Sequence, residues 1–219
     1  PVSFVSTSGQ AVDVDKITGA TLYMQTGDNQ LGGYYIDDVT LYQLKNDGDT
    51  FPYDGGFEQE LFVGVPGHIF HHGGTSRFTI SDSQAYSGES SLLVTGRDLV
   101  YSGPGWNVLD YLKDNGWGDW YISAYVRAVE PIAMQMYFSI YLKYNDGTED
   151  WLTSNTNVTF GNDGWIRVNA DTSGTPVKLV SSKGLTPDFS NLEVANMYMC
   201  TGDGQTNDFY IDDVELYRA

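Results

Sequence analysis

Adjacent aspartates are the residues of this sequence whose type and spacing most directly suggest chemistry. One pair lies in FYIDDVELYR (209–218), a run of alternating apolar residues that is typical of a β-strand. Because side chains alternate between the two faces of a strand, Asp212 is expected on the core face with Tyr210 and Val214. Asp213 then points to the opposite face. Two carboxylates on opposite faces cannot act on one substrate as an acid–base pair, so a catalytic dyad is not favoured.

A carboxylate among core residues needs compensation from a cation or from several hydrogen bonds. Carboxylate and carbonyl oxygens are the ligands that Ca²⁺ prefers. A structural calcium ion at Asp212 is therefore the favoured interpretation. The alternative is an aspartate that caps a turn or accepts hydrogen bonds at a strand edge.

The other aspartate pair, at 37–38, belongs to an internal repeat. Residues 1–42 align without a gap with residues 176–217, and about half of the aligned positions are identical. A segment of this size buries too little surface to fold alone. We therefore interpret 1–44 as the C-terminal fragment of a preceding homologous module, 45–54 as a linker and 55–219 as a complete module. The fragment is expected to pack on the full module or on a neighbouring chain.

The composition excludes several classes of partner. A formal net charge of −18 argues against nucleic acid and anionic membrane surfaces, but is compatible with a neutral or cationic ligand or with solubility alone. No apolar stretch has the length of a membrane span. The single cysteine, Cys200, forms no intramolecular disulfide. Neighbouring His71 and His72 point apart on a strand with no third ligand nearby, so they are interpreted as surface residues.

Short strand-like runs separated by turn signals such as YNDGT (144–148) and GNDG (161–164) predict an all-β sandwich. Residues 108–116 allow at most two helical turns. Each clear strand has one aliphatic face, expected in the core, and one face that mixes Tyr with polar groups. With 16 Tyr and 5 Trp in the chain, the second face is either a ligand-binding surface or an ordinary solvated one. The predicted core positions include Met134, Met136, Phe138, Ile140, Leu142, Trp120, Ile122, Ala124, Val126, Met197 and Met199.

Six motifs, in this order, resemble the xylan-binding carbohydrate-binding modules of families 4, 9 and 22. They are GGFEQ (55–59), AYSGESSLLVTGR (85–97), YSGPG (101–105), WYISAYVR (120–127), GWIRV (164–168) and FYIDDVELY (209–217). The resemblance implies a galactose-binding-like jelly-roll β-sandwich without catalytic activity, which binds single polysaccharide chains in a cleft on one sheet. It also implies a secreted, bacterial parent xylanase that the module tethers to xylan, and a structural calcium ion away from the cleft.

The resemblance also assigns residues to both sites. For calcium it implies side-chain ligands from Glu58 and Asp212, with backbone oxygens near Gly88 and Glu89. For the cleft it implies contacts to xylan or a xylo-oligosaccharide from Arg97, Tyr101, Trp106, Gln135, Tyr137 and Tyr198.

Two positions depart from the family pattern. Tyr101 stands where the family usually has Trp, and Cys200 stands where a sugar-binding glutamate is common, so its task would fall to Gln135 or another group. The alternatives are a loop-packing role for Tyr101 and Trp106, and a surface ion pair for Arg97. At the level of function, the alternatives are a structural spacer, a module for another β-glucan, and a hydrolase built on the same sandwich.

Overall fold

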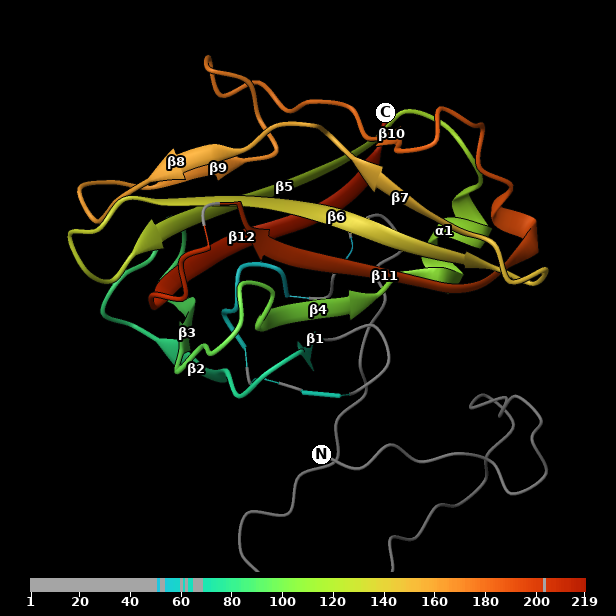
Figure 1. Cartoon of the computed structure of the whole chain (residues 1–219). Helices are drawn as coiled ribbons and strands as arrows, with labels where there is room; N and C mark the ends of the chain where they lie inside the picture. The colour runs from blue at the N-terminus through green and yellow to red at the C-terminus, as the bar shows by residue number, and fades with distance from the viewer. Residues whose placement is uncertain (1–50, 52–53, 60, 62, 65–68, 203) are drawn as a thin grey trace, which may run out of the picture. The chain divides into compact units, whose positions relative to one another are not determined.

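The structure is a computed structural model that describes residues 51, 54–59, 61, 63–64, 69–202 and 204–219. In this part of the chain, two antiparallel sheets stack as the layers of a β-sandwich (Figure 1). The predicted all-β sandwich is confirmed. The predictions for residues 1–44, including their packing, lie outside the described residues.

The larger sheet carries the strands that matter most for the candidate site. Its strands run in the order β1-β4-β11-β6-β7-β10, with β8 pairing with β6 beside this path. Every pairing is antiparallel. The strands are β1 (Ile69–His72), β4 (Gly103–Asn107), β6 (Met134–Tyr144), β7 (Glu149–Thr153), β8 (Val158–Phe160), β10 (Val180–Ser181) and β11 (Leu192–Thr201).

The smaller sheet has the order β2-β3-β12-β5-β9 and is also antiparallel throughout. Its central strand, β12, is the strand that carries Asp212. The strands are β2 (Arg77–Ser81), β3 (Ser91–Thr95), β5 (Trp120–Ala128), β9 (Ile166–Val168) and β12 (Phe209–Arg218).

The core lies between the two sheets and is built by strict alternation along the long strands. On β6, the apolar residues at the even positions from Met134 to Leu142 are fully buried, whereas Gln135, Tyr137 and Tyr141 face outward and are partly exposed. The same alternation holds on β5 and β11. All the predicted core positions have 0% exposure: Met134, Met136, Phe138, Ile140, Leu142, Trp120, Ile122, Ala124, Val126, Met197 and Met199.

A β-bulge in β12 changes the predicted faces of that strand. Its pairing register with β5 shifts between Asp212 and Glu215, and Asp213 adopts a positive φ of 46°. Because the bulge inserts a residue, the core face changes from Phe209 and Ile211 before it to Val214 and Leu216 after it. The prediction that Tyr210 shares the core face with Val214 is therefore wrong. Asp212 is nevertheless fully buried.

The described part of the chain also contains one short helix and a buried aromatic residue, Phe51, that precedes the strands. Helix α1 (Leu109–Asn115) has the predicted length of two turns and ends at Gly116, whose N–H donates to the carbonyl of Leu112 at 2.8 Å. A 3-10 turn at Phe189–Asn191 leads into β11. Phe51 is buried and bridges Leu216 of β12, so the packed sandwich includes residue 51, which lies within the segment 45–54.

Candidate functional site

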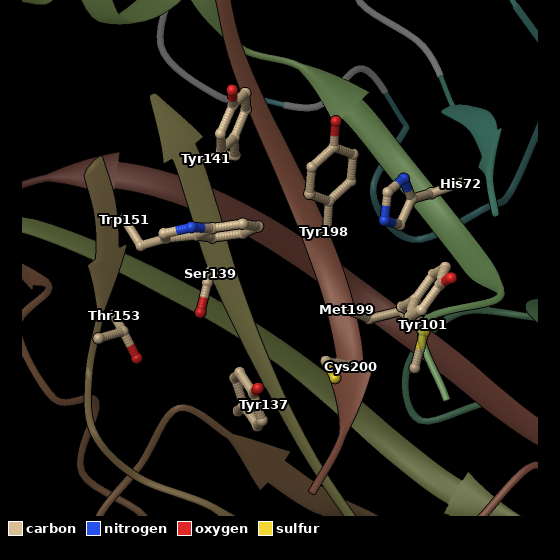
Figure 2. A pocket seen from close by; sticks show the side chains of 10 residues that line it. All are labelled: His72, Tyr101, Tyr137, Ser139, Tyr141, Trp151, Thr153, Tyr198, Met199 and Cys200. Atoms are coloured by element: carbon tan, nitrogen blue, oxygen red, sulfur yellow. The ribbon is translucent and has the colours of Figure 1, made fainter. Parts of the chain in front are cut away.

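A pocket of about 620 Å³ opens on the outer face of the larger sheet. Residues from β1, β6, β7 and β11 and from the loop before β4 line it. Figure 2 shows the side chains of these ten residues on the translucent strands. They are His72, Tyr101, Tyr137, Ser139, Tyr141, Trp151, Thr153, Tyr198, Met199 and Cys200.

The register of the sheet brings these residues together. Ser139 pairs with Tyr198 of β11 on one side and with Thr153 of β7 on the other. Cys200 is the partner of Tyr137 in the same sheet. Because directly paired residues point to the same face, each row places its side chains side by side above the sheet. The floor of the pocket is therefore a consequence of strand pairing.

Two glycines make room for this face. In β4, Gly105 pairs with Tyr198, and a Cβ at Gly105 would lie 2.9 Å from the ring of Phe70 and 3.1 Å from that of Tyr198. A Cβ at Gly103 would lie 2.3 Å from the sulfur of Met199. A larger side chain at either position must therefore displace a neighbouring side chain, which accounts for the two glycines of the YSGPG motif.

Aromatic rings form two opposite sides of the pocket. Trp151 projects from β7 on one side and is 41% exposed; Tyr101 lies on the other side and is 42% exposed (Figure 2). Between them, His72 stacks on Tyr198 with ring centroids 3.6 Å apart. Exposed aromatic faces of this kind can stack on apolar faces of a ligand such as the C–H face of a sugar ring.

Hydroxyl groups supply the polar contacts of the pocket. The hydroxyl of Tyr198 accepts a hydrogen bond from Asn196 Nδ2 at 2.8 Å, and that of Tyr141 donates to Glu149 Oε1 at 2.6 Å. The carboxylate of Glu149 raises the pKa of Tyr141 to about 12. A hydrogen bond with Cys200, together with burial, raises the pKa of Tyr137 to about 12. Both tyrosines are therefore neutral hydrogen-bonding groups at pH 7.

The histidine of the pocket is neutral as well. Burial lowers the pKa of His72 below its ordinary value of 6.5. Among the residues that the structure describes, the pocket wall contains no Asp, Glu, Lys or Arg. An uncharged aromatic surface that offers hydroxyl groups suits a neutral polyhydroxylated ligand.

Three of the predicted cleft residues meet in this pocket: Tyr101, Tyr137 and Tyr198. Gln135 lies on the outward face of β6, one outward position before Tyr137. Its Oε1 accepts a hydrogen bond from Asn157 Nδ2 at 3.0 Å, and it does not line the pocket.

The structure places Trp106 elsewhere. Trp106 is 1% exposed and pairs with Ile69 and Met197, two core residues. It packs against Phe138 with ring centroids 6.2 Å apart. A side chain in the core has no surface to offer a polysaccharide, so the prediction that Trp106 contacts the ligand is wrong.

Arg97 is also held inside the protein. It is 7% exposed, and its guanidinium donates to the carbonyls of Ser102, Asn207 and Val100 at 2.7, 3.1 and 2.9 Å. The guanidinium also lies 5.2 Å from the centre of the Phe209 ring. Arg97 therefore joins the loops next to the pocket and does not line the pocket itself, contrary to its predicted role as a ligand contact.

Three aromatic residues of the pocket were not predicted from the sequence as ligand contacts: His72, Tyr141 and Trp151. His72 points away from His71, as predicted for neighbours on a strand, because His71 stacks on Phe78 and His72 on Tyr198. His72 nevertheless lines the pocket, so its interpretation as an ordinary surface residue is incomplete. Trp151 carried a usable signal, since it is the outward residue of a short strand, flanked by the buried Asp150 and Leu152.

The predicted calcium residues gather on the smaller sheet, at the loop before β3. Glu58 Oε1 accepts hydrogen bonds from the N–H groups of Glu89 and Ser90 at 3.0 and 3.1 Å. Asp212 Oδ2 accepts from the N–H groups of Tyr86 and Ser87 at 2.7 and 3.2 Å. The backbone thus presents amides to both carboxylates, including the amide of Glu89.

A glycine leaves room for the carboxylate of Glu58 against this loop. Gly88 adopts φ 61°, and a Cβ on it would lie 2.1 Å from Glu58 Oε1. A Cβ on Gly56 would come closest to Asp213 Oδ1, at 3.3 Å, and would lie at ordinary contact distance from Glu58 Cγ and Asp212 Oδ1, at 3.8 and 3.9 Å. Burial raises the pKa of Asp212 to about 6. The described residues contain no group of three or more His, Cys, Asp or Glu side chains arranged for a metal, so a cation here needs carbonyl oxygens as well.

Solved structures with the same fold bind xylan. One is the first family 22 xylan-binding module (CBM22-1) of Xyn10C from Paenibacillus barcinonensis, with 17% identity over 75% of this chain and 92% of that one, and a TM-score of 0.57. The C-terminal family 22 module of Xyn10B from Clostridium thermocellum has 20% identity over 80% of this chain and 98% of that one, and a TM-score of 0.56. The chain has the jelly-roll fold of these modules.

A third similar structure joins such a module to an enzyme. It is the CBM22-1–GH10 portion of xylanase Xyn10B from Clostridium thermocellum in complex with xylohexaose, with 16% identity over 68% of this chain and 26% of that one, and a TM-score of 0.52. No protein-family model matches the chain, and no curated protein matches it in sequence. None of the described helices is long and apolar enough to cross a membrane.

Proposed function

We propose that this chain binds xylan or xylo-oligosaccharides in the pocket of the larger sheet without cleaving them. The observation that carries the proposal is the uncharged aromatic pocket between Trp151 and Tyr101, in a fold shared with xylan-binding modules. Sugar rings stack their C–H faces on the two exposed rings. The hydroxyls of Tyr137 and Ser139 exchange hydrogen bonds with the equatorial sugar hydroxyls.

A binding role accounts for this site better than hydrolysis does. Glycosidases use two carboxyl groups on either side of the scissile bond, one of them with a raised pKa. Among the described residues, none of the pocket-lining side chains is Asp or Glu. The buried carboxylate with a raised pKa, Asp212, lies on the smaller sheet.

The biological role that follows is tethering. A module that holds polysaccharide keeps an enzyme in the same parent chain at a high effective concentration near its substrate. The similar Clostridium thermocellum protein joins a CBM22-1 module to a GH10 module. We infer that the parent of this chain is a secreted xylanase that acts outside the cell.

Calorimetric titration with xylohexaose, and with cellohexaose in parallel, tests the proposal. We expect saturable binding of xylohexaose with a Kd of roughly micromolar to millimolar, because an open pocket leaves much of the sugar solvated. Tyr101→Ala and Tyr137→Ala should weaken it. The absence of heat with either sugar would favour the structural spacer, tighter binding of cellohexaose another β-glucan, and release of reducing sugar an enzyme.

We also propose that Glu58 and Asp212 hold a structural calcium ion together with carbonyl oxygens of the loop around Gly88. The two carboxylates approach the same loop, and Asp212 is fully buried without a Lys or Arg partner among the described residues. Their oxygens are the hard ligands that calcium prefers. The ion would neutralise the buried charge and fix the loop at the start of β3.

A further inference from the structure

Tyr101, which forms one side of the pocket, lies in a turn that is closed by hydrogen bonds. The N–H of Ser102 donates to the carbonyl of Leu99 at 2.9 Å, and the N–H of Leu99 donates to Ser102 Oγ at 3.1 Å. Tyr101 is therefore the third residue of a hydrogen-bonded four-residue turn. Arg97 adds hydrogen bonds to the carbonyls of Val100 and Ser102. The backbone on both sides of Tyr101 is thus held by its neighbours.

The ring of Tyr101 rests on the glycine loop that follows β1. A Cβ at Gly73 would lie 2.6 Å from Cδ2 and 2.7 Å from Cε2 of the Tyr101 ring, so a larger residue here must displace the ring. Gly73 and Gly74 also have positive φ angles, of 62° and 50°, which glycine adopts most readily. The ring is therefore supported by backbone, while the side chain is 42% exposed and can receive a ligand.

Asp98 joins this glycine loop to the turn. Its Oδ1 accepts hydrogen bonds from the N–H of Thr75 at 2.9 Å and from the hydroxyl of Ser102 at 2.8 Å. Thr75 directly follows the two glycines, and Ser102 directly follows Tyr101. Gly74 leaves room for the contact, because a Cβ there would lie 1.9 Å from both Asp98 Oδ1 and Ser102 Oγ. One carboxylate oxygen therefore links the surface under the ring to the turn that carries the ring.

We propose that Asp98 is a positioning residue for sugar binding, which holds the ring of Tyr101 in the orientation that receives the ligand. Asp98 is exposed and is not among the residues that line the pocket, so it acts through Tyr101. A ring that is already fixed loses less conformational freedom when the ligand binds, and this favours binding. The inference rests on the proposed function and adds a residue that sets its affinity.

Calorimetric titration with xylohexaose tests two substitutions of Asp98. Asp98→Ala removes the acceptor of both hydrogen bonds, and we expect about two- to tenfold weaker binding, which corresponds to the cost of ordering one side chain. Asp98→Asn keeps an acceptor oxygen, so its affinity should stay within about twofold of the wild type. Asp171→Ala is the matched control and should keep wild-type affinity. Asp171 Oδ1 accepts from the hydroxyl of Ser173 and the N–H of Thr175 in an exposed loop that does not line the pocket.

A double-mutant cycle separates positioning from a general loss of structure. In the Tyr101→Ala background no ring is left to position, so the addition of Asp98→Ala should cause no further loss of affinity. A substitution that only destabilised the sandwich would weaken binding equally in both backgrounds. Urea unfolding measures the stability of each variant independently of the ligand.

The free protein gives a readout that requires no sugar. In protein with carbon-13-labelled tyrosine rings, NMR relaxation measures the order parameter of the Tyr101 ring on the ps–ns timescale, and Tyr101→Phe identifies its signal. We expect this order parameter to fall in Asp98→Ala. It should keep its wild-type value in Asp98→Asn and in Asp171→Ala.

The outcomes separate this inference from the proposed function. The positioning role would be overturned by wild-type affinity of Asp98→Ala, by an equal loss in Asp98→Asn, or by an undiminished effect in the Tyr101→Ala background. An unchanged order parameter of the Tyr101 ring in Asp98→Ala would overturn it as well. Failure of xylohexaose to bind the wild type would instead refute the proposed function, and the order parameter would still decide whether Asp98 fixes the ring.

Discussion

Truncation of Trp151 gives a quantitative test of the binding site. An aromatic side chain has an accessible area of about 150–250 Å², and Trp151 is 41% exposed, which leaves roughly 100 Å² for a ligand. If a sugar ring covers half to all of this area, burial at about 25 cal/mol per Å² contributes roughly 1–2.5 kcal/mol. Trp151→Ala should therefore weaken binding by roughly 5- to 70-fold.

The fold should tolerate this substitution. Trp151 contacts Tyr141 and Tyr198 on the outer face, with ring centroids 5.1 and 6.3 Å away, and it contributes nothing to the buried core. Substitutions at such surface positions usually change the free energy of unfolding by less than about 0.5 kcal/mol. Trp165→Ala is the matched control, because Trp165 packs near Tyr86 and Tyr210 beside the smaller sheet.

Calorimetric titration with xylohexaose measures the affinity, and urea unfolding measures the stability of each variant. We expect a large loss of affinity for Trp151→Ala with nearly unchanged stability, and wild-type affinity for Trp165→Ala. Wild-type affinity of Trp151→Ala would refute the assignment of the ligand to this pocket. Equal losses in both variants would show that aromatic truncation acts on the whole sandwich.

Three further predictions concern stability, metal and pH. Arg97→Ala removes the guanidinium donor from the carbonyls of Ser102, Asn207 and Val100, of which the last keeps its donors from Thr201. Urea unfolding should therefore show a loss of about 3 kcal/mol, and a loss below about 1 kcal/mol would contradict the role of Arg97 in joining the loops. Chelation of calcium should lower the Tm by several degrees in the wild type and not in Glu58→Gln, and an unchanged wild-type Tm would remove the metal proposal. Burial lowers the pKa of His72, and a sugar that covers this ring lowers the pKa further, so the free protein binds more protons than the complex. The affinity of the wild type for xylohexaose should therefore be constant above pH 6.5 and fall as the pH drops below this value. The affinity of His72→Phe should not change with pH. A constant wild-type affinity down to pH 4.5 would contradict this role of His72.

Local alternation was enough to assign much of the fold and part of the site. The period of two along 134–143 and 196–201 placed Met136, Phe138 and Met197 in the core. By the same rule it placed Tyr137 and Tyr198 on the outer face, where the structure has them in the pocket. This works because a side chain's face depends only on its own strand, and a regular strand keeps its parity from end to end.

Alternation fails to assign faces correctly where the backbone of a strand is irregular. The bulge at Asp213 inserts one residue into β12, and it reverses the parity that regular alternation gives to Tyr210. The hydroxyl of Tyr210 lies within hydrogen-bond distance of Ser83 Oγ, at 3.2 Å, on the outside of the smaller sheet. The residue types in this segment do not predict the bulge, because Asp tolerates a positive φ without requiring it.

Pairing between strands that are far apart in the sequence decided which of the remaining residues reach the pocket and which reach the core. Trp106 follows a motif that resembles a cleft loop, but its register with Ile69 and Met197 directs it into the core. His72 and Trp151 come from strands that are far apart in the sequence, and only the order β1-β4-β11-β6-β7 brings them into one pocket. Sequence alone therefore determined the face of each residue on a regular strand. The tertiary structure decided which faces meet, because register and strand order depend on packing between segments that are far apart in the chain.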